Sequence, residues 1–240
     1  MEDFLHTHEA AELFRLNERS SALLLLDAPR PVPAADVILP FHPIYERAFA
    51  PAHGFASMHA LVDALSRSGR GGGGPAAPRC VRFRRSVFTP HGGSSALQRS
   101  VGTRSRCVGS PLVRGLVARV LRAIPELDAI PPRPNTTELV IVRGSGAKRR
   151  LDHPGWDDYV AKRRLDPTAL VQDMGAIPVL EQMQLARSVS SAIGQHGAAL
   201  THFLWMRPNA HAREVDVQRQ CECYHNIAVW MNLSYEQVVM

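Results

Sequence analysis

Short apolar segments alternate with helical segments through the carboxyl-terminal part of the chain. Glu138–Val142 (ELVIV) and Ser191–Gly194 (SAIG) have the length and apolar composition of buried strands. A further strand is predicted at Glu214–Val217, and helices are predicted at Pro178–Ser188, Gly197–Met206 and Cys223–Asn232. Strands and helices that alternate with short connections are typical of a parallel sheet covered by helices. The sequence therefore predicts an α/β fold.

Two segments rich in glycine or proline divide the chain. Ser66–Pro78 (SRSGRGGGGPAAP) contains four consecutive glycines, which the interior of a helix or strand accommodates only at a large entropy cost. Ile130–Asn135 (IPPRPN) is a stiff proline-rich connection. We therefore predict two domains: an amino-terminal one at residues 1–130 with a glycine-rich loop at 66–78, and a carboxyl-terminal one at residues 136–240.

The apolar pattern is weaker in the predicted amino-terminal domain. It indicates a short buried strand at Ala22–Leu26, a helix at Ser57–Leu65 and a strand at Cys80–Phe88. The clearest element is a helix at Pro111–Ile124, because proline opens it and aliphatic residues recur at helical spacing.

The net charge of +6 does not by itself indicate a nucleic-acid binder. Of 28 basic residues only Lys148 and Lys162 are lysines, and the arginines are spread from Arg15 to Arg219 rather than gathered in one stripe. Aromatic residues make up only 6% of the chain, so few side chains could stack on bases. A basic nucleic-acid binder stays as a minor alternative, which predicts binding to any polyanion with a steep salt dependence.

The four cysteines lack the spacing of a zinc ribbon. Cys80, Cys107, Cys221 and Cys223 form no C-x-x-C pair, and Cys221-Glu-Cys223 is a poor metal chelate alone. Asn135 and Asn232 each begin an N-x-[ST] sequon, and they are candidate glycosylation sites if the chain enters the secretory pathway.

The predicted junction at Gln195–Thr201 (QHGAALT) has the composition of an anion site. Gly197, Ala198 and Ala199 are small, so a ligand could approach the backbone closely. The first N–H groups of a helix have no partner within it and lie at the positive end of its dipole. Such a junction suits a phosphate or pyrophosphate. A tight strand-to-helix turn capped by His196 would explain the same residues, and this alternative stays open.

Several segments together resemble glycosyltransferase family 61. Leu180–Ala210 resembles its signature, in which a Glu-Gln pair opens a helix and a strand then leads into His-Gly-Ala. Three further segments resemble other parts of the family and occur in the same order along the chain. They are Leu139–Asp152 (a strand ending in Arg and a basic turn), Arg213-Glu214-Val215, and Cys223-Tyr224 with Leu233-Ser234-Tyr235. Cys80–Phe88 and the segment after Cys107 resemble the branch containing the EGF-domain-specific O-linked N-acetylglucosamine transferase, which we group with plant xylan arabinosyl- and xylosyltransferases.

This resemblance implies an enzyme with a GT-B-like pair of Rossmann-type lobes, the amino-terminal one abbreviated here. It implies an inverting transferase that moves a hexosyl or pentosyl group from a UDP-sugar to a glycan or glycoprotein without a metal or other cofactor. The chain agrees in having no Asp-x-Asp after an apolar strand. The resemblance also places the protein in the Golgi or endoplasmic reticulum lumen. The chain has no signal peptide or apolar run of membrane-spanning length, so we expect membrane attachment only through a segment absent from it.

The resemblance assigns roles to particular residues. It implies that Glu214 accepts hydrogen bonds from the ribose, although a solvated acid at a strand end is the alternative. It implies that Cys80 and Cys107 form a disulfide if the protein is lumenal. His6, His8 and Glu9 are the candidates for the catalytic base, with an ordinary terminal helix as the alternative. The donor diphosphate is expected to contact Arg143, Lys148, Arg149, His196, Gly197, Ala198, Ala199, Leu200 and Thr201.

A catalytically inactive nucleotide-binding remnant of the same family is the second hypothesis. Ala199 stands where the family usually has glycine, and Asp152 where it has asparagine. The short amino-terminal lobe, the glycine-rich break and the early carboxyl end also favour it. Nucleotide binding without turnover would distinguish this hypothesis from an active transferase.

Overall fold

The computed structural model describes residues 23–25, 42–49, 55–57, 104–134, 137–143, 154–215 and 221–240. The chain divides into two compact units. One comprises Thr7–Thr89, and the other comprises Pro90–Met240 with the first six residues. Helix α5 (Pro111–Ala123) therefore shares a unit with the elements that follow it, although it lies within residues 1–130, the range predicted for the amino-terminal domain.

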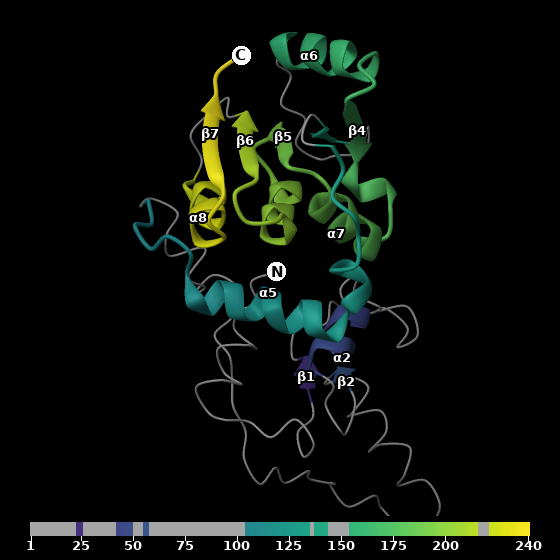
Figure 1. Cartoon of the computed structure of the whole chain (residues 1–240), viewed down its shortest axis with the longest axis vertical. Helices are drawn as coiled ribbons and strands as arrows, with labels where there is room; N and C mark the ends of the chain where they lie inside the picture. The colour runs from purple at the N-terminus through teal and green to yellow at the C-terminus, as the bar shows by residue number, and fades with distance from the viewer. Residues whose placement is uncertain are drawn as a thin grey trace, which may run out of the picture. The chain divides into compact units, whose positions relative to one another are not determined.

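The unit Thr7–Thr89 contains a small βαβ arrangement in its described part. Strand β1 (Leu23–Leu25) pairs in parallel with β2 (Phe55–Ser57), and helix α2 (His42–Phe49) lies between them in the sequence (Figure 1). Strand β1 confirms the strand predicted at Ala22–Leu26. The helix predicted from Ser57 is wrong at its first residue, which ends β2, and its remainder lies outside the described residues, as does the strand predicted at Cys80–Phe88.

The other unit is built on a five-stranded sheet whose strands are all parallel. Its strands are β3 (Glu138–Val142), β4 (Ala169–Asp173), β5 (Ser191–Gln195), β6 (His211–Val215) and β7 (Ser234–Val238). They are arranged in the order β4-β3-β5-β6-β7. This topology confirms the predicted α/β class. The predicted strands at 138 and 191 match β3 and β5, whereas β6 begins three residues before its predicted start, and β4 and β7 were not predicted.

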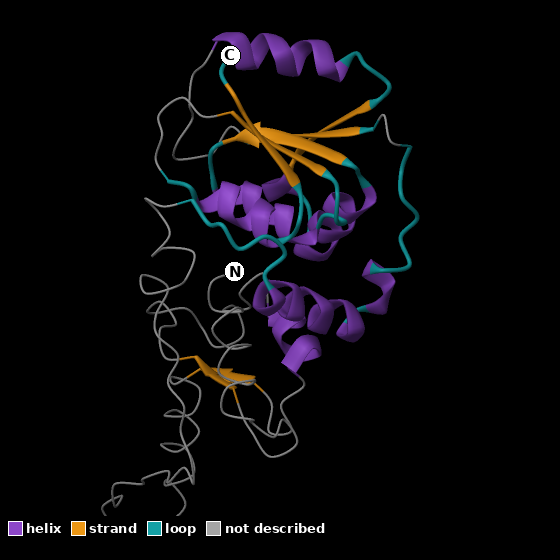
Figure 2. Ribbon diagram, turned by 60° about the vertical axis from the view of Figure 1, so that its left-hand side comes forward, coloured by secondary structure: helices purple, strands orange, loops and turns teal. Residues whose placement is uncertain are grey.

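Helices cover both faces of this sheet. Helix α6 (Pro154–Arg164) lies on one face, while α7 (Val179–Ser188), η5 (Ala198–Trp205) and α8 (Cys223–Trp230) lie on the other (Figure 2). The crossover from β3 to β4 runs in the opposite direction across the sheet from the three later crossovers. Because parallel crossovers are right-handed, its helix lies on the opposite face. Helix α5 packs beyond the layer of α8, and Gly109 N–H donates to Val229 O over 2.9 Å.

The helix predicted at Gly197–Met206 is a 3₁₀ helix rather than an α-helix. Leu200 N–H bonds to the carbonyl of Gly197, three residues back, over 2.9 Å. The hydroxyl of Thr201 bonds to the carbonyl of Ala198 over 2.7 Å. Its apolar side chains are buried on more than one side, including Leu200, Phe203 and Trp205. Tertiary burial therefore determines the geometry of this segment more than helical propensity does.

The two faces of the sheet have different side chains because strand residues alternate in direction. Val140, Ile193 and Val215 point to the α6 face, where they pack around Trp156. On the same face the buried carboxylate of Glu138 accepts a hydrogen bond from Tyr159 over 2.5 Å and pairs with Arg163 over 2.7 Å and with Arg213. This hydrogen bond and these ion pairs connect α6 with the start of β3 and with β6.

Replacing Gly194 with alanine is expected to destabilise the sheet unit by about 1–3 kcal/mol, because the site has no room for a methyl group. An added Cβ would lie 2.9 Å from Leu200 Cδ2 and 3.2 Å from the backbone oxygen of Ile141. Gly175→Ala is the matched control, because its Cβ would meet only Asp173 Oδ1 at 3.4 Å and should change stability by less than about 1 kcal/mol. Urea unfolding of both variants tests this, and equal midpoints would contradict the packing described.

A buried histidine is expected to make the fold acid-sensitive. The buried histidine is His202. The side-chain nitrogen of Gln182 donates to Ile177 O over 2.9 Å, so the Gln182 Oε1 atom accepts a hydrogen bond from His202 Nε2 over 2.6 Å. Burial lowers the pKa of His202 from 6.5 to about 4. In the unfolded chain His202 takes up a proton as the pH falls through 6.5, whereas in the folded chain His202 takes it up only near pH 4. Stability should therefore fall by up to about 3 kcal/mol across this window.

Unfolding in urea at several pH values measures that slope. His202→Gln should remove most of the loss between pH 6.5 and 4, whatever its effect on stability at neutral pH. An unchanged slope in the variant would assign the acid sensitivity to other groups.

Candidate functional site

The strand order creates a switch point between β3 and β5. From β3 the chain crosses to β4 on one side, and the later strands are added on the other side. In open parallel sheets ligands bind outside the carboxyl ends of the strands at such a point. Arg143 directly follows β3, and His196 and Gly197 directly follow β5. The structure therefore places three of the predicted donor-binding residues at this point.

Arg143 and the backbone after β5 contact each other directly. The Nη2 group of Arg143 donates a hydrogen bond to the carbonyl oxygen of His196. A Cβ on Gly197 would collide with the guanidinium of Arg143. The backbone of Gly197 is extended, with φ 164°, so glycine is needed here for space rather than for an unusual conformation.

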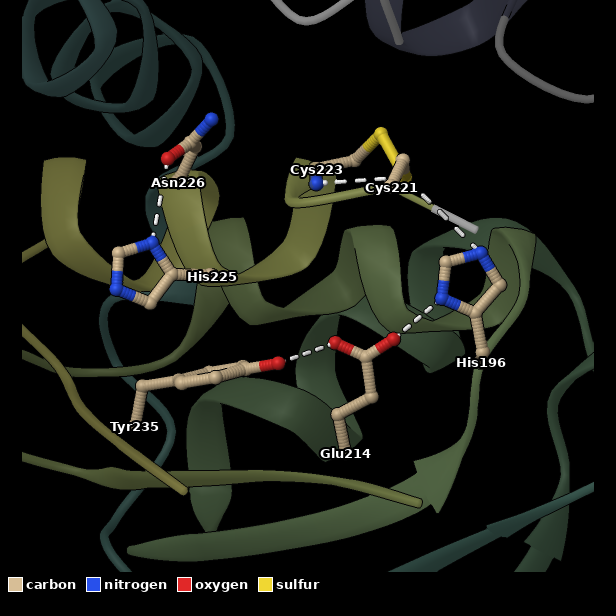
Figure 3. The surroundings of a disulfide bond; sticks show 7 residues. All are labelled: His196, Glu214, Cys221, Cys223, His225, Asn226 and Tyr235. Carbon is tan, nitrogen blue, oxygen red and sulfur yellow. Dashed lines mark hydrogen bonds and ion pairs between the residues drawn. A yellow bond between two sulfur atoms is a disulfide. The ribbon is translucent and has the colours of Figure 1, made fainter. Parts of the chain in front are cut away.

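Glu214 is buried at the end of β6 and joins two further side chains. It is only 2% exposed. One of its oxygens pairs with His196 Nδ1, and the other accepts a hydrogen bond from the hydroxyl of Tyr235 over 2.5 Å (Figure 3). Each oxygen thus accepts from one donor of the protein and keeps a further lone pair. Because Glu214 is almost inaccessible, the predicted ribose contact would require the surrounding side chains to move.

The hydrogen bonds of Glu214 fix the orientation of the His196 ring. A carboxylate only accepts, so Nδ1 carries the hydrogen that is donated to Glu214, and Nε2 is left at the opposite side of the ring. The ring of Tyr224 meets the His196 ring edge to face, with centroids 5.0 Å apart. Cys221 Sγ lies 4.0 Å from Nε2. This arrangement of a carboxylate, an oriented imidazole and a sulfur was not predicted.

Two tyrosines beside Glu214 remain protonated at neutral pH. Burial and the negative charge of Glu214 raise the pKa of Tyr224 to about 12, against the opposing effect of Arg143. Burial and the hydrogen bond to Glu214 raise the pKa of Tyr235 well above its ordinary value. Tyr235 therefore acts as a hydrogen-bond donor to the carboxylate. Both tyrosines fall in the segments that resemble the tail of the family, which was the signal available in the sequence.

The remaining predicted diphosphate contacts differ in position. Ala198 and Ala199 open η5 beside Gly197, and Ala198 is exposed. Leu200 is completely buried in the core, and the hydroxyl of Thr201 bonds within its own helix. The side chains of Leu200 and Thr201 thus serve the fold, so a ligand at this edge would meet backbone groups and the small side chains before them. Lys148 and Arg149 lie outside the described residues.

Other predicted site residues also lie outside the described part of the chain, namely His6, His8, Glu9, Cys80 and Asn135. Asn232 is described. It is exposed, has a left-handed φ of 58°, and donates its side-chain amide to Asn209 Oδ1 over 3.1 Å. Its glycosylation stays a prediction.

The described residues contain a disulfide that the resemblance did not imply. Cys221 and Cys223 form a disulfide at the start of α8, two positions apart in the sequence (Figure 3). Cys107 is exposed and free among the described residues, and Cys80 lies outside them, so the Cys80–Cys107 bond stays a prediction. The segment preceding α5 packs on α8, where Ser105 N–H donates to Asn226 Oδ1 over 2.6 Å.

The described residues show neither a metal-binding cluster nor a membrane-spanning helix. They contain no group of three or more His, Cys, Asp or Glu side chains arranged to hold a metal ion. No helix in the described ranges is both long and apolar enough to cross a membrane.

Comparison with known proteins gives no further assignment. No protein-family model matches the chain. No curated protein matches it either. The resemblance to glycosyltransferase family 61 therefore stands on the sequence segments described above alone.

Proposed function

We propose that this protein is an inverting, metal-independent glycosyltransferase that transfers a sugar from a UDP-sugar to a glycan or glycoprotein. The observation that carries the proposal is the meeting of Arg143, His196 and Gly197 at the switch point between β3 and β5. These are the residues for which the resemblance implies contact with the donor diphosphate.

The chemistry of this edge suits a departing nucleoside diphosphate. Negative charge grows on the diphosphate as the glycosidic bond breaks, so a fixed cation and backbone N–H groups there stabilise the transition state more than the bound donor. Arg143 supplies the cation, and the small residues Gly197 and Ala198 let phosphate oxygens approach the backbone. Glu214 acts as a positioning residue, because it fixes the ring of His196 at the same edge.

The GT-B arrangement is part of the same proposal. The sheet unit would be the donor lobe, because its order of parallel strands suits nucleotide binding. The amino-terminal side of the chain would supply the acceptor lobe and the base, with His6, His8 and Glu9 as candidates. Placement in the Golgi or endoplasmic reticulum lumen belongs to this proposal too.

The inactive nucleotide-binding remnant stays as the second candidate. It is favoured by the 3₁₀ geometry of η5, which presents a shorter run of aligned N–H groups than an α-helix would. The enclosure of Glu214 by His196 and Tyr235 also favours it.

Donor turnover separates the two candidates. The full chain is incubated with a panel of UDP-sugars in EDTA, with water or glycans as acceptors, and released UDP is measured. An active transferase should release UDP from one donor and give a product of inverted anomeric configuration. Its rate should be at least tenfold lower in Arg143→Met. Saturable UDP binding without turnover of any donor would instead support the remnant.

A further inference from the structure

The Cys221–Cys223 disulfide lies beside a histidine that is itself held by a carboxylate. Cys221 Sγ is 4.0 Å from His196 Nε2, and the other ring nitrogen of His196 bonds to Glu214 (Figure 3). The N–H of Cys223 donates to Cys221 Sγ over 3.3 Å. Both cysteines are only half-buried, so a small thiol can approach them.

We propose that Cys221 and Cys223 form a redox-active site for thiol–disulfide exchange, in which His196 activates Cys221. The substrates are thiols, either a low-molecular-weight thiol such as glutathione or a cysteine pair of another protein. This site does not depend on the proposed sugar transfer, and its test needs no nucleotide.

The geometry distinguishes the two sulfurs. An activated cysteine needs a base within reach and a third group that orients the base. Cys221 has both, in His196 and Glu214. Its sulfur also accepts the N–H of Cys223 at the start of α8, where the helix dipole favours negative charge. Cys221 is therefore the sulfur whose thiolate is stabilised, and Cys223 is the one that an incoming thiol attacks.

The exchange balances without a further reactant. A thiolate of the reducing substrate attacks Cys223 Sγ and forms a mixed disulfide, while the bond between the two protein sulfurs breaks and Cys221 leaves as a thiolate. The first substrate thiol gives its proton to His196 Nε2 as its thiolate forms, and His196 passes this proton to Cys221. A second substrate thiol loses its proton to water, and its thiolate attacks the substrate sulfur of the mixed disulfide and releases Cys223, which takes up a proton from water. Two thiols are oxidised to a disulfide, and the protein disulfide is reduced to two thiols.

The first test equilibrates the full chain in a series of reduced and oxidised glutathione mixtures, followed by acid quenching and alkylation. Trypsin cleaves after Arg219, and no Lys or Arg follows, so one carboxyl-terminal peptide carries both Cys221 and Cys223. The proposal predicts that this peptide changes reversibly from the closed to the doubly alkylated form while circular dichroism shows a folded protein. A bond that opens only when the protein unfolds would overturn it, as would cysteines that never close.

The second test measures which sulfur His196 activates. In single-cysteine variants, Cys221 in Cys223→Ser should react with iodoacetamide at neutral pH about fivefold faster than Cys223 in Cys221→Ser. Adding His196→Gln should abolish this advantage. Adding His225→Gln should not, because His225 lies against Tyr235 rather than Cys221. Equal rates for the two sulfurs, or no effect of His196→Gln in a folded variant, would overturn the assignment.

Discussion

Replacing Glu214 with alanine is expected to lower the free energy of unfolding by about 3–5 kcal/mol. The carboxylate is 2% exposed and holds His196 and Tyr235 at once. Its removal leaves two donors without their acceptor in a site that water barely reaches, and it leaves a cavity as well. Glu214→Gln keeps the volume and one acceptor oxygen, so it should cost clearly less.

Guanidinium unfolding followed by circular dichroism measures both variants. Glu236→Ala is the matched control, because Glu236 lies on the neighbouring strand β7 and its side chain is 54% exposed beside His211. The control should change stability by less than about 0.5 kcal/mol. If Glu214→Ala were as stable as the control, Glu214 could not be the residue that fixes His196.

Replacing Gly197 with alanine is expected to weaken UDP binding at least tenfold, which corresponds to about 1.4 kcal/mol or more. The new methyl group would occupy the position of the Arg143 guanidinium, so Arg143 must leave the carbonyl of His196. Because the Arg143 guanidinium ends a long, half-buried side chain that can turn aside, the displacement should change stability little. The effect should therefore appear in affinity rather than in folding.

Calorimetric titration of UDP into the variant and into Gly175→Ala separates these effects. The control carries the same chemical change after β4, where the added Cβ meets an ordinary contact, and it should bind UDP as the unsubstituted chain does. Equal affinities in all three proteins would show that the diphosphate does not bind at Arg143 and Gly197.

The sequence predicted the strands that are buried on both faces better than the others. The continuous apolar runs of β3 and the small residues of β5 could be recognised without tertiary information. Strands β4 (ALVQD) and β7 (SYEQV) are the edges of the sheet, and their residues are partly exposed and polar, so their periodicity is weak. Helix α6 (PGWDDYVAKRR) was not predicted either, because its many charged residues leave only a weak apolar pattern.

The candidate site was predictable in its residues but not in its contacts. The resemblance named Arg143, His196 and Glu214 as donor-site residues, and the carboxyl ends of the parallel strands β3, β5 and β6 bring these three residues to one edge of the sheet. That Glu214 is enclosed by His196 and Tyr235 depends on strand order and register, which the sequence pattern does not determine. The pairing of Cys221 with Cys223 beside His196 likewise required the fold.

Calorimetric titration of UDP into the unsubstituted full chain, with and without EDTA, tests the central claim most directly. The proposal predicts saturable binding that EDTA does not change and that Arg143→Met weakens at least tenfold. A folded protein that shows no binding of UDP in either buffer would contradict a nucleotide site at the switch point.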